Sequence, residues 1–553
     1  MKYSKFIKPF TLITALSLIT VTGSIAANAA VINDESTVMQ SAGEQSDSFS
    51  TKSSLPSKYS SVEQGNVTSV KTQQYNDCWA YAGIAAFESK LLADGFTNVN
   101  MTMEHLNAWA TTRSNSTGWL RNQYDEGYAE IPLGYFTSWS GAVLASDVAD
   151  IDFSLIESGD EVPTNLAKYG ATAIEYFDKT NPDAIKEAIM ENGGVYSSFG
   201  SNSVCYNAEE TAYYMPEDVQ LTYIGHAIEV VGWDDNYAAS NFNTQYGLRP
   251  KKAGAWLCKN SWGNYNSLGG YFWISYYDKY IFSDLFYPSY TINSVEQITD
   301  DKKLIQNEIY GATYEFNYLV DDTITYANKF TYDDNYKTID KVIFETEALG
   351  ADYIIYYAPN GSDGNPDPKK SNWTKLYSGT VDYKGYICAD IDDFYVPDES
   401  GSIAITIDTS SQNIGVTPAN SNFKISTIGV GEWLTKSTGE FIFKNDSQPG
   451  ESYIIENNKS TDLLDWYKTN LDDPLGGTFV IKAVTLKDDD YELGDVDKDG
   501  TLTISDATMI QKYIAQYETF DDYTLTLADF NGDNTIDIGD ATAIQKSLAG
   551  MDS

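Results

Sequence analysis

The chain has 553 residues, enough for roughly three or four domains with their own hydrophobic cores. It carries 36 basic and 79 acidic side chains, a net charge of −43. Such a polyanion excludes nucleic acid and an anionic membrane surface as main partners, and suits an exposed, soluble protein or bound cations such as calcium. With two histidines and four cysteines, a disulfide-rich scaffold and any three-histidine site are also excluded.

The first 29 residues, 1–29, read as a secretory signal peptide. Three lysines precede an apolar run over 10–19, and an A-x-A cleavage pattern spans 27–29. Residues 30–54 are rich in Ser, Thr, Asp and Glu, which predicts a polar linker. No later segment approaches the roughly 18 consecutive apolar residues of a membrane span. We therefore expect an exported protein, and its sparse cysteine fits anaerobic surroundings.

Composition divides the remainder into three parts. Residues 55–290 mix helical and strand-like stretches, which indicates an α+β domain. Residues 296–486 alternate β-branched and aromatic residues with turn residues, which predicts an all-β sandwich. Residues 490–553 form a small C-terminal domain. The last 66 residues hold sixteen acidic residues and three lysines, a local net charge of −13.

Cys78 stands immediately before a run of good helix formers. Its sulfur would lie at a helix N-terminus, where the macrodipole favours the nucleophilic thiolate. His226 heads the apolar strand 227–232 and is the best base. The Asn260 side-chain oxygen would accept from one ring nitrogen and leave the other for the thiol. Trp262 would cover that hydrogen bond and exclude water.

These segments resemble the papain-like cysteine peptidases. The order is Cys, His, Asn, with 148 residues from Cys78 to His226 and 34 from His226 to Asn260, as in that family. The segments that also match lie at 65–71, 101–106 and 269–274. The resemblance covers 55–287 and implies a two-lobed peptidase. In it Cys78 attacks the peptide carbonyl, His226 carries the proton to the leaving amine, and Asn260 orients His226.

The resemblance also implies an oxyanion hole made by the Cys78 backbone N–H and a glutamine amide. The family's glutamine lies about six residues before the cysteine, where this chain has Thr72. We assign the role to Gln73, with Gln74 as runner-up. Asp77 replaces a small residue of the family and would oppose thiolate formation if its carboxylate pointed inward.

Five further residues receive weaker assignments. Gly127 and Gly225 are expected along the substrate cleft. His105 shares a predicted helix with large apolar residues, so we interpret it as a packed histidine. For Cys205 and Cys258 a disulfide and two free thiols both remain open.

The strands of the second part resemble the lectin-like domain that follows bacterial papain-like peptidases. The resemblance covers 311–484, and its aromatic-rich motifs lie at 314–317, 325–331 and 353–357. If exposed, Trp373 and Trp466 would stack on sugars or hold a substrate. The alternative is that these aromatics form a core or pack against the peptidase.

The acidic C-terminal part contains a repeat with a period of 34 residues. Each copy places oxygen-bearing side chains at loop positions 1, 3, 5 and 12, the spacing of a calcium loop. Position 6 is Gly500 in one copy and Asn534 in the other, and both tolerate a left-handed backbone. The expected ligands are Asp495, Asp497, Asp499, Thr501, Thr503 and Asp506, then Asp529, Asn531, Asp533, Thr535, Asp537 and Asp540.

Two such loops, each followed by one helix over 507–515 or 541–549, resemble a type I dockerin over 493–550. The resemblance implies a module that folds on two Ca²⁺ ions and docks onto a cohesin of a scaffoldin, as in cellulosomes. The residues expected at that contact are Ile504, Ser505, Gln511, Lys512, Ile538, Gly539, Gln545 and Lys546.

The combined prediction is a secreted, multidomain α+β cysteine endopeptidase docked through calcium-dependent contacts to a cellulosome-type or cell-surface complex of an anaerobic bacterium. Its expected partners are a cohesin, protein or peptide substrates, and a glycan bound by the lectin-like domain. Catalysis is expected to need no cofactor. One alternative is a weak or inactive peptidase fold that serves as a glycan- or protein-binding adhesion component. Another keeps the nucleophile but binds inhibitors or processes scaffold proteins.

Overall fold

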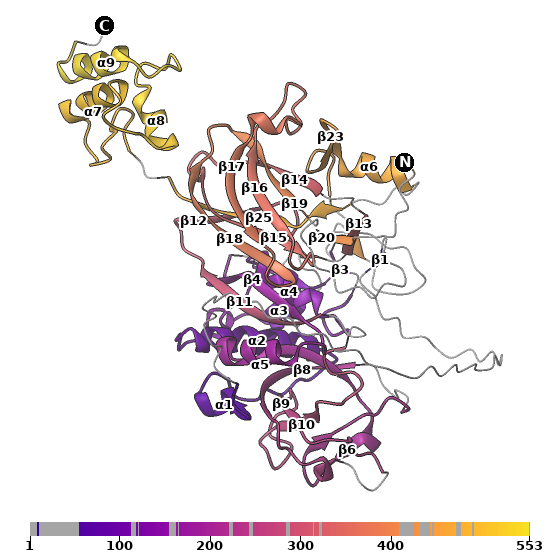
Figure 1. Ribbon diagram of the computed structural model, residues 1–553. Helices are drawn as coiled ribbons and strands as arrows, with labels where there is room; N and C mark the ends of the chain where they lie inside the picture. Colours follow the sequence, from indigo (N-terminus) through magenta and orange to yellow (C-terminus); the bar gives the residue numbers. More distant parts are fainter. Residues whose placement is uncertain are drawn as a thin grey trace, which may run out of the picture.

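The structure is a computed structural model, and three bodies follow one another along its chain (Figure 1). It describes residues 8–9, 55–111, 118–119, 121–153, 162–163, 165–219, 225–242, 247–283, 288–312, 314–319, 323–408, 425–431, 443–444, 447–471, 477–488 and 491–551. The predicted signal peptide 1–29 and linker 30–54 lie outside these residues, except for the short strand β1 (Lys8–Pro9). Among the described residues, no helix is long and apolar enough to cross a bilayer.

The first body contains a helical lobe built around α2 (Cys78–Ala93). This helix is buried along most of its length because small and apolar residues occupy nearly all of its faces. Aromatic rings fill the space between α2 and its neighbours, with the Phe87 and Phe136 ring centroids 4.6 Å apart. The other helices of this body are α1 (Ser61–Gln64), α3 (Met103–Trp109), α4 (Glu130–Thr137) and α5 (Pro182–Asn192).

The second lobe is built on a sheet in which β8 pairs antiparallel with β5 on one side and with β9 on the other. The apolar run of β8 is buried throughout its interior because α2 packs on it and the lobe's own aromatic core covers the rest. The strands of the first body are β2 (Lys58–Ser60), β3 (Gly118–Trp119), β4 (Tyr169–Phe177), β5 (Val195–Gly200), β6 (Tyr206–Asn207), β7 (Ala212–Tyr213), β8 (Gly225–Asp234), β9 (Ala255–Lys259), β10 (Tyr271–Ser275) and β11 (Ser289–Gln297).

The second body is the predicted sandwich, with alternate residues of two sheets meeting in one core. One sheet has the order β17-β16-β19-β14-β22-β23, and the other contains β12, β25, β15 and β18 with β13, β20 and β24. Its strands are β12 (Lys302–Gln306), β13 (Tyr314–Leu319), β14 (Thr323–Thr331), β15 (Thr338–Thr346), β16 (Asp352–Ala358), β17 (Thr374–Thr380), β18 (Gly385–Tyr395), β19 (Ser400–Asp408), β20 (Ile425–Gly431), β21 (Phe443–Lys444), β22 (Ser452–Glu456), β23 (Lys459–Asp462), β24 (Thr478–Phe479) and β25 (Ile481–Leu486). The α-helix α6 (Leu463–Leu471) lies between β23 and β24.

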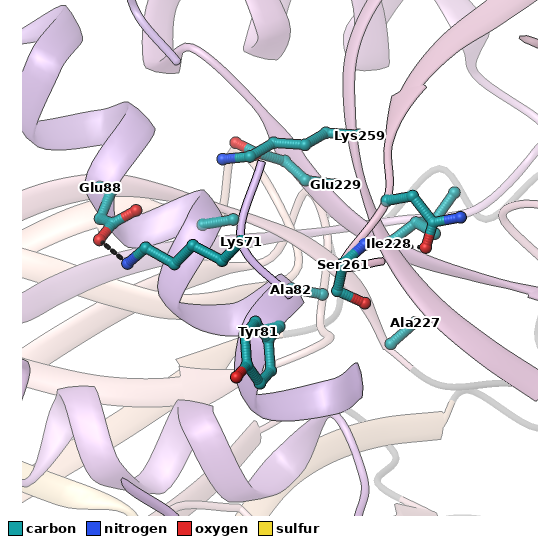
Figure 2. Close-up of a pocket in the computed structure, with 11 residues that line it drawn as sticks. Lys71, Tyr81, Ala82, Glu88, Ala227, Ile228, Glu229, Lys259 and Ser261 are labelled. Carbon is teal, nitrogen blue, oxygen red and sulfur yellow. Dashed lines mark hydrogen bonds and ion pairs between the residues drawn. The ribbon is translucent and has the colours of Figure 1, made fainter. Parts of the chain in front are cut away.

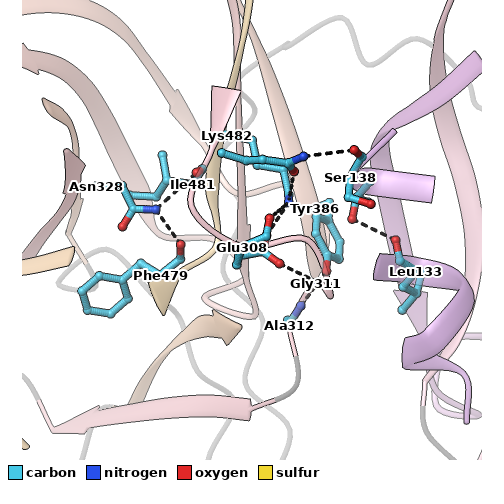
Figure 3. A network of polar contacts seen from close by, with 12 residues as sticks. Leu133, Ser138, Glu308, Gly311, Ala312, Asn328, Tyr386, Phe479, Ile481 and Lys482 are labelled. Carbon is cyan, nitrogen blue, oxygen red and sulfur yellow. Dashed lines mark hydrogen bonds and ion pairs between the residues drawn. The ribbon is translucent and has the colours of Figure 1, made fainter. Parts of the chain in front are cut away.

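The first two bodies share a sheet. Strand β4 of the first body pairs antiparallel with β18 of the sandwich, with Tyr386 opposite Ile174. A buried ion pair lies nearby, between the fully buried side chains of Lys482 and Glu308 (Figure 3). Lys482 also donates to the Gln306 side chain at 2.6 Å, and Gln306 donates to the backbone carbonyl of Ser138 at 3.0 Å. Strand pairing and buried polar contacts therefore join these two bodies.

The C-terminal body packs α7 (Ile504–Ile514) against α9 (Ile538–Leu548) around a small apolar core. Both helices begin three residues earlier than the predicted 507 and 541, because capping boxes start them: Thr503 with Asp506, and Asp537 with Asp540. A short additional helix, α8 (Asp522–Ala528), precedes the second loop. It meets the sandwich through Tyr523, whose ring centroid lies 5.1 Å from that of Tyr395.

Candidate active site and calcium loops

Cys78 is the first residue of α2 and carries a free, half-buried thiol. Burial raises the pKa of the thiol to about 11, because the anion loses hydration. A hydrogen bond with the backbone of Ala227 opposes that effect. Ala227 follows His226 in β8, so the structure brings the predicted nucleophile next to the strand that carries the predicted base.

His226 and Asn260 are in direct contact. The His226 Nε2 atom lies 2.8 Å from the Asn260 Oδ1 atom, and both side chains are buried. This bond occupies one ring nitrogen and leaves Nδ1 for another partner. The Asn260 amide is itself oriented, since its Nδ2 donates to the Tyr265 hydroxyl at 3.0 Å. Burial lowers the pKa of His226 to about 4, so the imidazole is neutral at neutral pH.

Trp262 lies over the His226 ring. Their ring centroids are 4.8 Å apart with an interplanar angle of 28°, and 45% of the Trp262 surface is exposed. Tyr265 meets the indole edge-on at 5.5 Å. The two rings form a cover on the solvent side of the imidazole, which keeps water from the hydrogen bond beneath it.

The two glutamines considered for the oxyanion hole differ in their surroundings. Gln73 is half-buried and its amide is held at both ends: Nε2 donates to the carbonyl of Tyr75 at 2.8 Å, and Oε1 accepts from the Ser261 hydroxyl. One N–H of Nε2 remains for a substrate oxygen, because an amide nitrogen has two. Gln74 is exposed. The geometry favours Gln73 over Gln74.

The carboxylate of Asp77 points inward. The residue is only 4% exposed, and its Oδ2 accepts from Asn107 at 3.2 Å. It sits at the N-cap of α2 but makes no side-chain capping bond. Its negative charge contributes to the raised pKa of Cys78. The sequence predicts weaker thiolate formation if the Asp77 carboxylate points inward, and in the structure it does.

The two glycines predicted along the cleft both lie near this site. Gly127 packs on the indole of Trp79, the residue after Cys78, and a Cβ at Gly127 would lie 2.5 Å from its ring. Only glycine permits this close approach. Gly225 is the first residue of β8, directly before His226, and pairs with Gly200.

Sequence reasoning missed a buried charged network beneath the site. Lys71 lies 2.5 Å from Glu88, and Lys259 lies 3.3 Å from Glu229. The Thr68 hydroxyl joins the two pairs, since it accepts from Lys259 and donates to Glu88. These four charged side chains line a small cavity between α2, β8 and β9 (Figure 2). The sequence does contain a signal for this network: Glu88 and Glu229 each interrupt an otherwise apolar stretch.

The acidic side chains of the first calcium loop converge. Carboxylate oxygens of Asp495, Asp497 and Asp499 all lie within 4.8 Å of one another. The Asp497 Oδ1 atom is buried and has no hydrogen-bond partner among the described residues, as expected for a carboxylate oxygen that coordinates a cation. Asp506 fastens the loop by accepting from the backbone N–H groups of Val496 and Asp497.

The second loop repeats this backbone pattern. Asp529 accepts from the N–H groups of Asp533 and Asn534, as Asp495 accepts from Asp499 and Gly500 in the first loop. Both position-6 residues have the expected left-handed backbone, with φ of +84° at Gly500 and +63° at Asn534. Thr503 and Asp537, predicted as ligands, cap the following helices with their side chains. The residues present fit calcium in both loops.

The residues predicted to contact a cohesin lie at equivalent positions of α7 and α9. In each helix two of them are in the first turn and two are near the C-terminal end. Ile504 and Ile538 are 60% and 58% exposed, unusually high for isoleucine. The others that are exposed are Ser505, Gln511, Lys512, Gln545 and Lys546, while Gly539 is half-buried.

Other predictions can be placed as well. His105 is a buried core residue, bonded to the Tyr135 hydroxyl and the Pro163 carbonyl at 2.7 Å each. Cys205 and Cys258 are buried free thiols. Of the two interpretations left open for Trp373 and Trp466, the structure shows the core: they are 9% and 3% exposed, and their rings fill sandwich cores. Neither indole is exposed for stacking on a sugar.

Comparison with known proteins follows the same three parts. Family profiles match the papain family of cysteine proteases at 55–285, a lectin-like domain at 304–485 and a type I dockerin domain at 493–549. A search of curated proteins finds no match.

Two solved structures match both the peptidase and the sandwich. One is the clostridial cysteine protease Cwp84 after propeptide cleavage, with 32% identity and a TM-score of 0.65, covering 78% of this chain and 99% of that chain. The other holds the cysteine protease and lectin-like domains of Cwp84, a surface layer associated protein of Clostridium difficile, with 32% identity and a TM-score of 0.65, covering 79% and 90%.

The chain therefore belongs to the papain family of cysteine proteases. Within that class it combines the protease with a lectin-like domain, as in the Cwp84 structures, and with a type I dockerin domain. The predicted family resemblances and the multidomain α+β fold class are confirmed.

Proposed function

We propose that this protein is a secreted cysteine endopeptidase that uses Cys78, His226 and Asn260. The observation that carries the proposal is the His226–Asn260 hydrogen bond at 2.8 Å, beside the helix N-terminus that begins at Cys78. Asn260 fixes the ring so that Nδ1 can take the thiol proton, and Trp262 shields the bond.

In the proposed reaction, the Cys78 sulfur attacks the peptide carbonyl carbon while its proton passes to His226. The oxyanion that forms accepts from the Cys78 backbone N–H, which has no partner within the helix at this first position, and from the Gln73 amide. His226 then gives the proton to the leaving amine as the C–N bond breaks. Water activated by His226 hydrolyses the thioester and restores the thiol.

Substitution of the nucleophile tests the proposal. We expect Cys78→Ala to abolish casein and peptide-library hydrolysis, and a thiol-directed epoxide to label Cys78 in the wild-type chain. Cys388→Ala removes a half-buried thiol in the sandwich and serves as the matched control, with activity retained. Equal rates of hydrolysis by Cys78→Ala and by the wild type would contradict the proposal.

An inactive binding protein is the second proposed function. The inward-pointing Asp77 favours it, because a buried carboxylate beside the thiol opposes thiolate formation. In that case the chain would serve as an adhesion component of its complex. Absence of epoxide labelling and of hydrolysis, with glycan-array binding by the whole chain, would select this function.

We also propose that residues 490–553 bind two Ca²⁺ ions and dock to a cohesin through Ile504, Ile538 and their exposed neighbours. The dockerin and the surface location of Cwp84 support an extracellular site of action. The proposed division of the chain is signal peptide 1–29, linker 30–54, peptidase 55–290, lectin-like domain 296–486 and dockerin 490–553. Cohesin capture by the whole chain that persists in excess EDTA would contradict the calcium-dependent docking.

A further inference from the structure

Arg121 is a buried arginine at the start of the loop 121–127, which ends at Gly127. Arg121 is only 4% exposed, and its guanidinium group donates to backbone carbonyls at 2.6–3.4 Å. These carbonyls belong to Asn107, Ala110, Gln123, Asp125 and Glu126. A planar fork with five donors suits this arrangement, and it fixes the shape of the loop.

The loop is also fastened to the helix that carries the nucleophile. The Arg121 guanidinium carbon lies 4.7 Å from the ring centroid of Trp79, a cation–π contact. Gly127, at the other end of the loop, packs on the same indole. Because Trp79 follows Cys78, the position of the loop is set relative to the thiol.

Within the loop, the Tyr124 ring packs against the Tyr75 ring in a tilted arrangement, with an interplanar angle of 34°. The ring centroids are 4.1 Å apart, and both rings are partly exposed, 38% for Tyr124 and 51% for Tyr75. The carbonyl of Tyr75 is the group that accepts from Gln73 Nε2 at 2.8 Å. The far end of the Gln73 amide accepts from Ser261, the residue after Asn260. Tyr75 is therefore one of two anchors of the Gln73 side chain.

We propose that Arg121 and Tyr124 are positioning residues of the oxyanion hole. Arg121 holds the loop, Tyr124 holds Tyr75, and the Tyr75 carbonyl keeps the Gln73 amide in place. They act through Gln73, so the inference rests on the proposed function of that residue. A donor that is already oriented stabilises the oxyanion without reorganising, whereas a loose donor loses that advantage at the moment of reaction.

A double-mutant cycle with Tyr124→Ala and Gln73→Ala tests this coupling. We expect Tyr124→Ala to lower kcat about tenfold with KM changed less than about twofold, because the interaction is made only in the transition state. In the Gln73→Ala background, Tyr124→Ala should change kcat less than about twofold. Tyr124→Phe keeps the ring and should restore kcat. Tyr277→Ala removes an exposed tyrosine elsewhere in the peptidase, 43% exposed, and is the matched control.

Arg121→Lys provides a second variant, since an ammonium group cannot reach all five carbonyls; it should lower kcat like Tyr124→Ala. Additive effects of Tyr124→Ala and Gln73→Ala, or a change in KM alone, would overturn the inference. If the wild-type chain shows Cys78-dependent turnover but the effects of Tyr124→Ala and Gln73→Ala are additive, only the inference about the positioning residues is overturned. A wild-type chain without Cys78-dependent turnover overturns the proposed function and the inference with it.

Discussion

Burial keeps the His226 imidazole neutral. Trp262 contributes to this burial, because its ring covers the imidazole on the solvent side. Since burial lowers the pKa of His226 to about 4, the acid limb of kcat/KM should fall near that pH. Trp262→Ala lets water reach the ring, so the pKa should rise toward the ordinary value near 6.5 and the acid limb should move up by about one pH unit.

The measurement is the pH profile of kcat/KM between about pH 3.5 and 8, with Tyr277→Ala as control. An acid limb that stays in place after Trp262→Ala would show that Trp262 does not shield the imidazole.

Asp77 gives a second prediction at the scale of single residues. Its carboxylate raises the pKa of the Cys78 thiol, so Asp77→Ser should lower that pKa and increase the thiolate fraction at pH 7. We expect alkylation of Cys78 by iodoacetamide to become on the order of threefold faster. Asp94→Ser changes the exposed C-cap of the same helix and should leave the rate unchanged. Slower alkylation of Asp77→Ser would contradict the electrostatic argument.

At the scale of elements, the two calcium loops differ in charge. The first presents Asp495, Asp497 and Asp499 at positions 1, 3 and 5, whereas the second has the neutral Asn531 at position 3. Affinity of such loops increases with the number of charged ligands, so the first loop should bind Ca²⁺ about tenfold more tightly.

Calorimetric titration of the chelator-treated whole chain measures both sites. Asn531→Asp should narrow the difference, and Asp497→Ala should weaken the first site. If Asn531→Asp leaves both affinities unchanged, ligand charge does not explain the difference between the loops.

At the scale of the whole molecule, the peptidase and the sandwich are joined by the β4–β18 pair and the buried Lys482–Glu308 ion pair. Lys482→Met would leave the Glu308 carboxylate buried without its partner, which should lower the free energy of unfolding by about 3–5 kcal/mol. The double variant with Glu308→Leu should recover most of that loss. Lys303→Met breaks a largely exposed ion pair with Asp333 and should cost less than about 1 kcal/mol.

Urea unfolding, followed by probes in both parts, measures these changes. A loss from Lys482→Met no larger than that from Lys303→Met would contradict the argument. Separate transitions of the two parts would show that the shared sheet does not couple them.

The chemistry of the site and of the loops was predictable because each depends on a short, continuous stretch of sequence. A cysteine before helix formers, a histidine at the head of an apolar strand and acids at alternate loop positions carry their meaning locally. The earlier starts of α7 and α9 were also predictable, since Thr503-x-x-Asp506 and its repeat are capping boxes.

Only the tertiary structure decided what is buried and what meets across the chain. The inward direction of Asp77, the burial of Trp373 and the carbonyl contacts of Arg121 depend on residues from separate elements. The pairing of Ile174 with Tyr386 joins strands more than 200 residues apart. Burial and cross-strand contact are properties of the assembled fold, so a local pattern of residue types identifies the reacting groups but not the surroundings that set their pKa and orientation.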